Sequence, residues 1–404
     1  MTPGRLAVGA ALATLLAGLG CHENVTAPGS CPALCPAANI VVVDTVLTGF
    51  VTSDASYRGY VAPSEAPELE VADLASLRSV ALVRFLGRDS TWFPATNDTA
   101  VGIGQVDSVQ VSVTLTGRDT TVKNLRILVY RLPGHLDTGM TWAGVQPFLA
   151  DSQLVDTIAV ADSVTAGTVV WSVRTGALDS IPAADSGVVS LAFAVRGAAQ
   201  TGLGLTSIEN SAGGSHLTWF VHARAPRDTL THQFLVSTSF DTFVFDPPQP
   251  VLPNALTAGG LPSARSILRL NLPSLAIDSV RVLRATLILT PTGPARGLPN
   301  TSFVLSARGI VRDLGAKSVI FGDTAAGGTV AVAVGDSSEI DIDVGRLLRA
   351  WGTTAGDSLP RVLMLLGEPE GGSMDEVSVG RGSGGAAAPR LHLTFVRPYP
   401  FGLP

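Results

Sequence analysis

The chain is poor in lysine and in charged residues generally. Of its 27 basic residues only Lys123 and Lys317 are lysines, and no run or stripe of basic residues occurs. A nucleic-acid-binding surface needs such a cluster to neutralise phosphates, so we expect no nucleic-acid partner. Charged residues form 15% of the chain and hydrophobic residues 46%. This balance supplies ample apolar cores and excludes wholesale disorder.

Cysteine is scarce as well, because the chain has three cysteines and all lie within its first 35 residues. Cys31 and Cys35 flank Pro-Ala-Leu, and outside the cytoplasm they could close a small disulfide loop. A zinc site is the alternative, but only His22 and Glu23 lie nearby to complete it. The remainder of the chain must therefore fold on apolar cores alone.

Several catalytic signatures are absent. No G-x-S-x-G serine elbow occurs, and the G-x-G-x-x-G at 380–385 leads into an apolar strand pattern instead of the helix that a dinucleotide site needs. His216 and His222 would lie roughly 20 Å apart on one strand, too far for one zinc ion. We therefore predict a protein that is no enzyme and needs no cofactor. A hydrolase with a dispersed site remains the enzymatic alternative.

The N-terminus has the pattern of an export signal. Arg5 precedes an apolar run of 15 residues, 6–20, which is too short to cross a bilayer comfortably. Small residues then lead to Cys21, and this end resembles the bacterial lipoprotein signal, in which the cysteine is acylated. The resemblance implies a lipid anchor at Cys21, a membrane partner, and a location in the cell envelope, at the outer surface or in the periplasm. Ordinary cleavage with secretion and an uncleaved anchor are the alternatives.

Short β-branched runs separated by turns fill the rest of the chain. In 107–116 every second residue is apolar, the period of a half-buried strand. Glycine (43), proline (26) and many Asp-Ser and Asp-Thr pairs supply the turns. Strands are predicted at 40–46, 80–85, 109–116, 125–130, 169–173, 188–195, 217–221, 267–272, 280–289, 362–366 and 391–396, and a short helix at 344–351. The fold class is all-β.

Four motifs recur in the same order in both halves of the chain, which indicates an internal duplication. They are 78–85 with 265–272, 107–111 with 278–282, the Asp-Ser pairs at 185 and 357 with the runs that follow, and 216–221 with 392–396. We therefore predict two tandem β-sandwich domains of jelly-roll type. The predicted divisions are a signal peptide (1–20), a Cys/Pro-rich tether (21–38), two domains (39–228 and 229–398) and a tail (399–404).

The second copy resembles the DNRLRE-type β-sandwich domain, which is similar to carbohydrate-binding modules. The segments that carry the resemblance are 240–244, 265–275, 280–289, 340–344, 378–382 and 389–395. It covers residues 234–397 and, more distantly, 40–224. The resemblance implies a jelly-roll-like sandwich on a secreted or surface protein, and by itself no reaction.

Sugar-binding sandwiches stack exposed aromatic rings on the apolar faces of sugars, and aromatic residues form only 6% of this chain. Those in loop-like settings are the candidate ligand contacts: Trp92, Trp142, Tyr57 and Tyr60. Partial burial under a loop is the alternative for the two tryptophans. Trp171, Trp219 and Trp351 fall in apolar runs and are predicted core residues.

Three carboxylates alternate with apolar residues at Glu339, Asp341 and Asp343. They are the candidate ligands for a structural calcium ion, which prefers several oxygen ligands around one point. Carboxylates spaced about 6.6 Å apart along a strand converge poorly, so a solvated strand face is the alternative, as is a glycosidase carboxylate pair.

The function predicted from these observations is that of a non-catalytic envelope lipoprotein, a surface binding or structural module whose partner is a polysaccharide. The alternative is a structural or adhesive protein that binds other envelope proteins. An exposed apolar patch would favour the alternative.

Overall fold

The computed structural model describes residues 42–89, 91–92, 101–133, 135–173, 178, 188–211, 213–223, 230–273, 281–314, 319–321, 327–353 and 359–396. Strands dominate the described residues, which confirms the all-β, sandwich-like fold class. The helix predicted at 344–351 is α5 (Gly345–Trp351). No helix in the described part of the chain is long and apolar enough to cross a membrane.

The first folded unit is one large curled sheet with strand order β13-β12-β6-β11-β3-β4-β10-β7-β8, to which β5 and β9 add on β6. Because β13 also pairs with β4, part of this sheet closes into a ring. The strands are β3 (Glu68–Asp73), β4 (Arg78–Phe85), β5 (Thr91–Trp92), β6 (Val101–Arg118), β7 (Arg126–Arg131), β8 (Leu154–Ala159), β9 (Gly167–Val173), β10 (Val189–Arg196), β11 (Thr201–Thr206), β12 (His216–Ala223) and β13 (Thr231–Asp246).

The second folded unit is a sandwich of two sheets, with strand orders β1-β23-β16-β20 and β18-β17-β21-β15-β14-β22, the latter joined by β19 and β2. Its strands are β1 (Val42–Leu47), β2 (Val51–Arg58), β14 (Ala255–Gly259), β15 (Ala264–Leu270), β16 (Arg281–Leu289), β17 (Ser302–Asp313), β18 (Val319–Phe321), β19 (Gly328–Ala333), β20 (Ile340–Asp343), β21 (Val362–Glu368), β22 (Glu376–Gly380) and β23 (Arg390–Val396).

Each unit encloses its own apolar core. In the first unit the inward residues of β3, β4, β6 and β10 meet, among them Phe85 and Phe193. In the second unit the facing sheets and α5 bury leucines and Trp351, which is 1% exposed. The alternating apolar positions of the strands therefore face inward, as a period of two requires.

The two halves share one pattern of strand pairing. The pairs β3–β4, β4–β10, β10–β7, β3–β11 and β6–β12 of the first unit correspond to β14–β15, β15–β21, β21–β17, β14–β22 and β16–β23 of the second. The long strand β13 pairs with both β12 and β4. Its counterparts in the second unit are β1, which pairs with β23, and β2, which pairs with β15.

The leading strands of the two halves are therefore exchanged. β1 and β2 open the first half of the chain but complete the second unit, whereas β13 opens the second half but completes the first unit. The predicted boundaries, 39–228 and 229–398, differ from this arrangement. The folded units are 68–246, and 42–58 together with 255–396, because the segments 59–67 and 247–254 cross the junction between the units.

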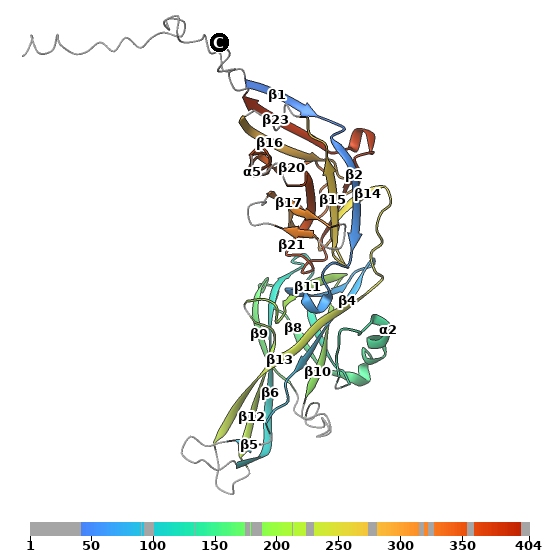
Figure 1. Ribbon diagram of the computed structural model, residues 1–404. Helices are drawn as coiled ribbons and strands as arrows, with labels where there is room; N and C mark the ends of the chain where they lie inside the picture. The colour runs from blue at the N-terminus through green and yellow to red at the C-terminus, as the bar shows by residue number, and fades with distance from the viewer. Residues whose placement is uncertain are drawn as a thin grey trace, which may run out of the picture.

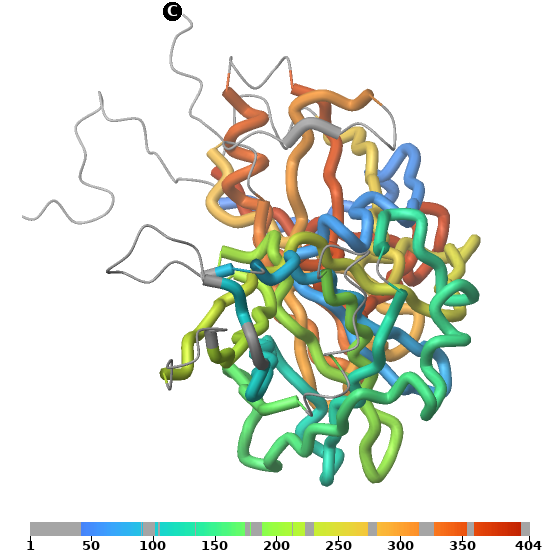
Figure 2. The backbone as a smooth tube through the Cα atoms, turned by 90° about the horizontal axis from the view of Figure 1, so that it is seen from below, coloured from blue at the N-terminus to red at the C-terminus, as the bar shows by residue number. Residues whose placement is uncertain are grey.

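The two units are stacked end to end, and the blue strands β1 and β2 lie among the orange and red strands of the second unit (Figure 1). Viewed from below, along the long axis, the two units project onto one another (Figure 2). Three side chains of the second unit, Leu261, Leu298 and Met374, belong to the core cluster of the first unit. The junction is thus a packed apolar contact.

Candidate ligand-binding site at the junction of the two units

Two of the four aromatic candidates lie together. Tyr57, in β2, is 36% exposed, and its ring lies edge-on to the ring of Tyr60 with the centroids 6.4 Å apart. The Arg265 guanidinium lies 4.5 Å from the Tyr60 ring centroid and forms an ion pair with Glu370. Burial raises the pKa of the Tyr60 hydroxyl to about 12. Because Arg265 stacks on the Tyr60 ring, this pair does not form a continuous aromatic platform.

Trp142 packs against the first unit. It begins the four-residue helix α2 (Trp142–Val145), which lies on the outer face of β4, β7 and β10. Arg78 stacks on its indole at 4.9 Å and forms an ion pair with Asp246 at 2.9 Å. The indole Nε1 is buried without a hydrogen-bond partner among the described residues. These contacts are those of a tryptophan half-buried under a loop.

Trp92 and the three cysteines are the remaining candidates. Trp92 lies in β5 opposite Val101 of β6, and its side chain is outside what the structure describes. Cys21, Cys31 and Cys35 also lie outside the described residues, so the lipid anchor and the disulfide loop stay predictions.

The three candidate calcium ligands have separate environments. Glu339 forms an ion pair with Arg390, and an Asp343 carboxylate oxygen accepts a hydrogen bond from the Gly345 amide at 2.8 Å as α5 begins. Asp341 is exposed on β20 opposite Ile288. Within the described ranges, no group of three or more His, Cys, Asp or Glu side chains could hold a metal ion.

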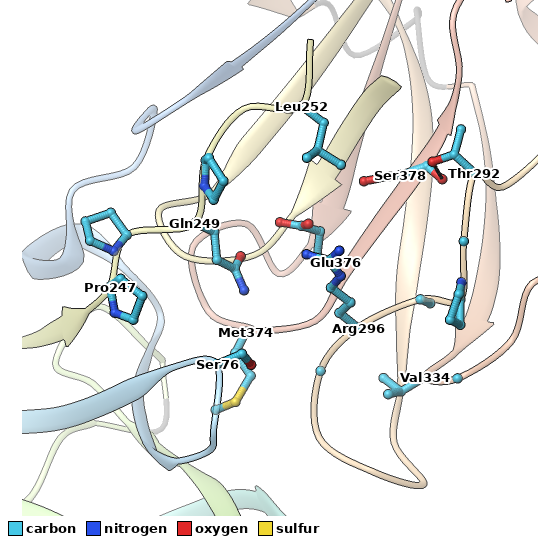
Figure 3. A pocket seen from close by; sticks show the side chains of 17 residues that line it. Ser76, Pro247, Gln249, Leu252, Thr292, Arg296, Val334, Met374, Glu376 and Ser378 are labelled. Carbon is cyan, nitrogen blue, oxygen red and sulfur yellow. Dashed lines mark hydrogen bonds between the residues drawn. The ribbon is translucent and has the colours of Figure 1, made fainter. Parts of the chain in front are cut away.

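A pocket of about 630 Å³ lies where the two units meet. One wall is the proline-rich crossing segment 247–252, and the other is formed by 292–297 with 334–335. Ser76 reaches it from the first unit, and residues 374–378 form its floor. In Figure 3 Gln249, Arg296 and Glu376 point toward the space between these segments. Tyr57, Tyr60 and Trp142 are not among the residues that line it.

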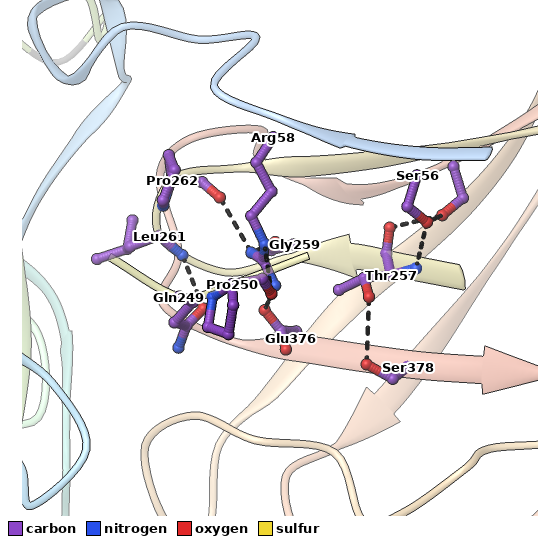
Figure 4. A network of polar contacts seen from close by, with 11 residues as sticks. Ser56, Arg58, Gln249, Pro250, Thr257, Gly259, Leu261, Pro262, Glu376 and Ser378 are labelled. Atoms are coloured by element: carbon purple, nitrogen blue, oxygen red, sulfur yellow. Dashed lines mark hydrogen bonds and ion pairs between the residues drawn. The ribbon is translucent and has the colours of Figure 1, made fainter. Parts of the chain in front are cut away.

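A buried ion pair supports the floor of this junction pocket. Arg58, the last residue of β2, forms an ion pair with Glu376, the first residue of β22, and their side chains are only 6% and 2% exposed. The same guanidinium donates to the carbonyl oxygens of Pro250 at 3.2 Å and Pro262 at 3.1 Å (Figure 4). Strand β2 is thereby tied to the crossing segment and to the turn between β14 and β15.

Gly260 leaves the room that this ion pair needs. Its φ is +80°, a conformation that side chains with a Cβ rarely adopt. A Cβ there would collide with the Gln249 side-chain oxygen and with the Glu376 carboxylate. The Leu261 amide donates to the same Gln249 oxygen at 3.1 Å, which fixes the orientation of the Gln249 side chain at the pocket wall.

Hydroxyl groups continue along the floor. The Ser378 and Thr257 hydroxyls lie 3.3 Å apart, and the Thr292 hydroxyl donates to the Ser378 carbonyl oxygen at 3.3 Å. Behind them the Ser56 hydroxyl accepts from the Thr257 amide at 2.8 Å and contacts the Ser266 hydroxyl at 2.6 Å (Figure 4). The pocket therefore offers polar groups held in place by a network anchored on β2.

Arg296 supplies the uncompensated charge of the pocket. Its backbone amide and carbonyl exchange two 2.8 Å hydrogen bonds with Glu376, which fix its position beside β22. Its side chain is exposed, and its guanidinium has no ion-pair or hydrogen-bond partner among the described residues. Because the Glu376 carboxylate is already paired with Arg58, the Arg296 guanidinium is left without a counter-ion among the residues that the structure describes, beside hydroxyl and amide groups.

A second, smaller pocket of about 190 Å³ at the junction is acidic. Burial raises the pKa values of Glu68 and Asp375, and raises that of Glu70 well above its ordinary value. The Thr116 hydroxyl donates to Glu68, and the Leu298 amide donates to Asp375 at 3.0 Å. Protonation of these carboxyls therefore favours the packed junction, so the contact between the units is expected to be stronger in acid.

Sequence reasoning missed the junction pocket because its parts are far apart in the chain. Arg58 and Glu376 are separated by 318 residues. The local signal that could have drawn attention is the run Asp-Pro-Pro-Gln-Pro at 246–250, because such a segment suits a rigid connection between folded units.

No protein-family model matches the chain, and no curated protein matches it.

Proposed function

We propose that the chain is a non-catalytic binding module of the cell envelope, and that the junction pocket binds an acidic polysaccharide. The observation that carries this proposal is the guanidinium of Arg296, which has no partner among the described residues, in a pocket whose other polar side chains are hydroxyls, an amide and the Glu376 carboxylate already paired with Arg58. The proposed anchor at Cys21 would hold the module at the membrane, with the segment up to β1 as a tether.

The chemistry of the pocket suits a sugar that carries a carboxylate or a sulfate. A guanidinium donates paired hydrogen bonds to such an anion, and these are stronger than neutral hydrogen bonds. The side chains of Gln249, Thr292 and Ser378 can exchange hydrogen bonds with sugar hydroxyls. Leu252 and the proline rings of 247–250 supply an apolar wall for the C–H face of the sugar. A volume of about 630 Å³ lies within the ordinary range for small-ligand sites.

Binding of the full chain to an array of neutral and acidic glycans, with and without calcium, tests this proposal. We expect saturable binding to acidic glycans that weakens about tenfold or more in Arg296→Gln, because charged hydrogen bonds are worth about 1.5–3 kcal/mol. Arg126→Gln, an exposed arginine of β7 in the first unit, is the matched control and should leave affinity unchanged. Equal binding of both variants would contradict the assignment to this pocket, and failure to bind any glycan would contradict the function.

A protein partner is the second candidate, favoured by apolar residues at the far end of the first unit. Leu230 and Leu235 are each 68% exposed, and Leu86 is 53% exposed. The Leu86 amide donates to the Ser237 carbonyl oxygen at 3.1 Å, which places Leu86 beside β13. A protein that binds here should lose affinity on Leu235→Ser, whereas glycan binding at the junction pocket should not change.

A further inference from the structure

The second unit is completed by β1 and β2, the first two strands that the structure describes. The second unit is complete only when β1 lies beside β23 and β2 beside β15, and both strands come from the opposite end of the chain. Val42 pairs with Val396 and Arg58 pairs with Ala264, so 354 and 206 residues separate these partners. Strands β1 and β2 therefore form a donor segment, defined here as residues 42–58. The second unit must capture this segment after most of the chain has been made.

The contacts that hold the donor segment are specific and strong. The Asp54 carboxylate accepts hydrogen bonds from the Arg381 guanidinium at 2.8 Å and from the Gly382 amide at 2.5 Å. Arg58 is paired with Glu376 in the interior, and β2 follows β15 in register over most of its length. All these groups belong to the donor segment and to the second unit. They would form identically if the donor segment came from another copy of the chain.

Only the segment 59–67 decides which copy receives the donor segment. It begins at Gly59, whose φ is +81°, and its backbone is tied to the second unit by one hydrogen bond, from the Gly59 amide to the Ser263 carbonyl oxygen at 2.9 Å. Farther along, Ala66 is buried in the core of the first unit. A change of backbone angles between Gly59 and Ala66 would redirect the donor segment and keep its strand pairing and ion pair with the second unit, with a loss limited to the packing of this short segment, including Val61, on the first unit's core. Exchange of an identical element between copies has a low cost for this reason.

Closing a long loop has an entropic cost that grows with its length. Capture of a donor segment from a neighbouring copy replaces this closure across more than 200 residues with the entropic cost of association, which falls as the local concentration of copies rises. Copies confined to one surface would be close enough to compete for it.

We propose that copies of this chain associate by exchanging residues 42–58, so that β1 and β2 of one copy complete the second unit of another. Reciprocal exchange gives a closed dimer, and sequential exchange gives a head-to-tail chain. The partner is thus a second copy of this chain, and the interaction surface consists of the edges of β23 and β15 that β1 and β2 cover in this structure. This association does not depend on the proposed glycan binding.

A cysteine pair at the β2–β15 contact tests the exchange directly. The hydroxyls of Ser56 and Ser266 lie 2.6 Å apart and the two residues are opposite each other in register, a geometry close to that of a disulfide. Full-length chains with Cys21, Cys31 and Cys35 changed to serine are made with S56C alone and with S266C alone. The two variants are mixed, refolded together at high protein concentration, oxidised, and separated without reductant.

We expect a disulfide-linked S56C–S266C dimer that is absent when either variant is refolded alone and that diminishes on dilution. The matched control is the mixture of T114C and T168C, whose hydroxyls lie 3.0 Å apart on β6 and β9 within the first unit. This control should give no mixed dimer, because neither strand is exchanged. Monomers alone in the S56C and S266C mixture, with circular dichroism showing native β-structure, would overturn the proposal.

Discussion

Asp241 illustrates the effect of one incompletely satisfied carboxyl. It lies in β13 and is 1% exposed. One carboxylate oxygen accepts a hydrogen bond from the Ile208 amide at 2.9 Å, and the other is buried without a partner among the described residues. Burial raises the pKa of this carboxyl from 3.8 to about 7, and the nearby Glu209 charge adds to the increase. The folded protein therefore keeps a proton on Asp241 that the unfolded chain has already released.

The sign of the pH effect follows from this difference. Because the folded state binds the proton more tightly, the carboxyl favours folding most below pH 3.8, and this contribution is lost as the pH rises to about 7. Asp241→Asn should therefore raise the free energy of unfolding at pH 8 by up to about 4 kcal/mol. It should change little near pH 4. Urea unfolding at both pH values is the measurement, and an equal effect at both would contradict the account.

The strands that the pattern predicts are those with uninterrupted β-branched runs. Residues 80–85 and 109–116 fall in β4 and β6, whereas β11 was not predicted. Its sequence, Thr-Gly-Leu-Gly-Leu-Thr, contains two glycines, which are depleted in strands. In the folded chain Leu298 and Thr116 occupy the space that a Cβ on Gly202 or Gly204 would need. Tertiary contact therefore explains these glycines, and local pattern alone could not reveal it.

At the same scale, the ion pair of Arg58 with Glu376 fixes β2 to the edge of its sheet. Removing one partner leaves the other charge buried and unpaired, whereas removing both does not. Arg58→Met should lower the free energy of unfolding by about 3–5 kcal/mol. The double change Arg58→Met with Glu376→Met should cost less than this single change. Chemical unfolding of both variants decides the matter, and a double variant less stable than Arg58→Met would contradict the account.

At the scale of the whole molecule, the repeated motifs indicate two related halves. The sequence pattern does not indicate with which half the first strands of each half will pair. Local alternation predicts that 40–46 is a strand, and it is β1. Its partner β23 lies at the other end of the chain, and no local property distinguishes this pairing from one within the first half.

The candidate site shows the same limit. The loop-like settings of Trp142 and Tyr57 predict ligand contacts, but these two residues lie on different units. The junction pocket combines Arg296 and Glu376 of the second unit with Gln249 of the crossing segment, and these residues are far apart in the chain. The floor of the pocket depends on the pairing of β2 with the second unit, because Arg58 of the donor segment supports it.

The most direct test of this account is hydrogen–deuterium exchange of the full chain with and without a saturating acidic oligosaccharide. We predict slower amide exchange in three segments that surround the junction pocket, 247–252, 292–297 and 374–378, with no change in the face that carries Tyr57 and Tyr60. Protection confined to the tyrosines, to α2 or to the far end of the first unit would contradict the assignment of the junction pocket as the binding site.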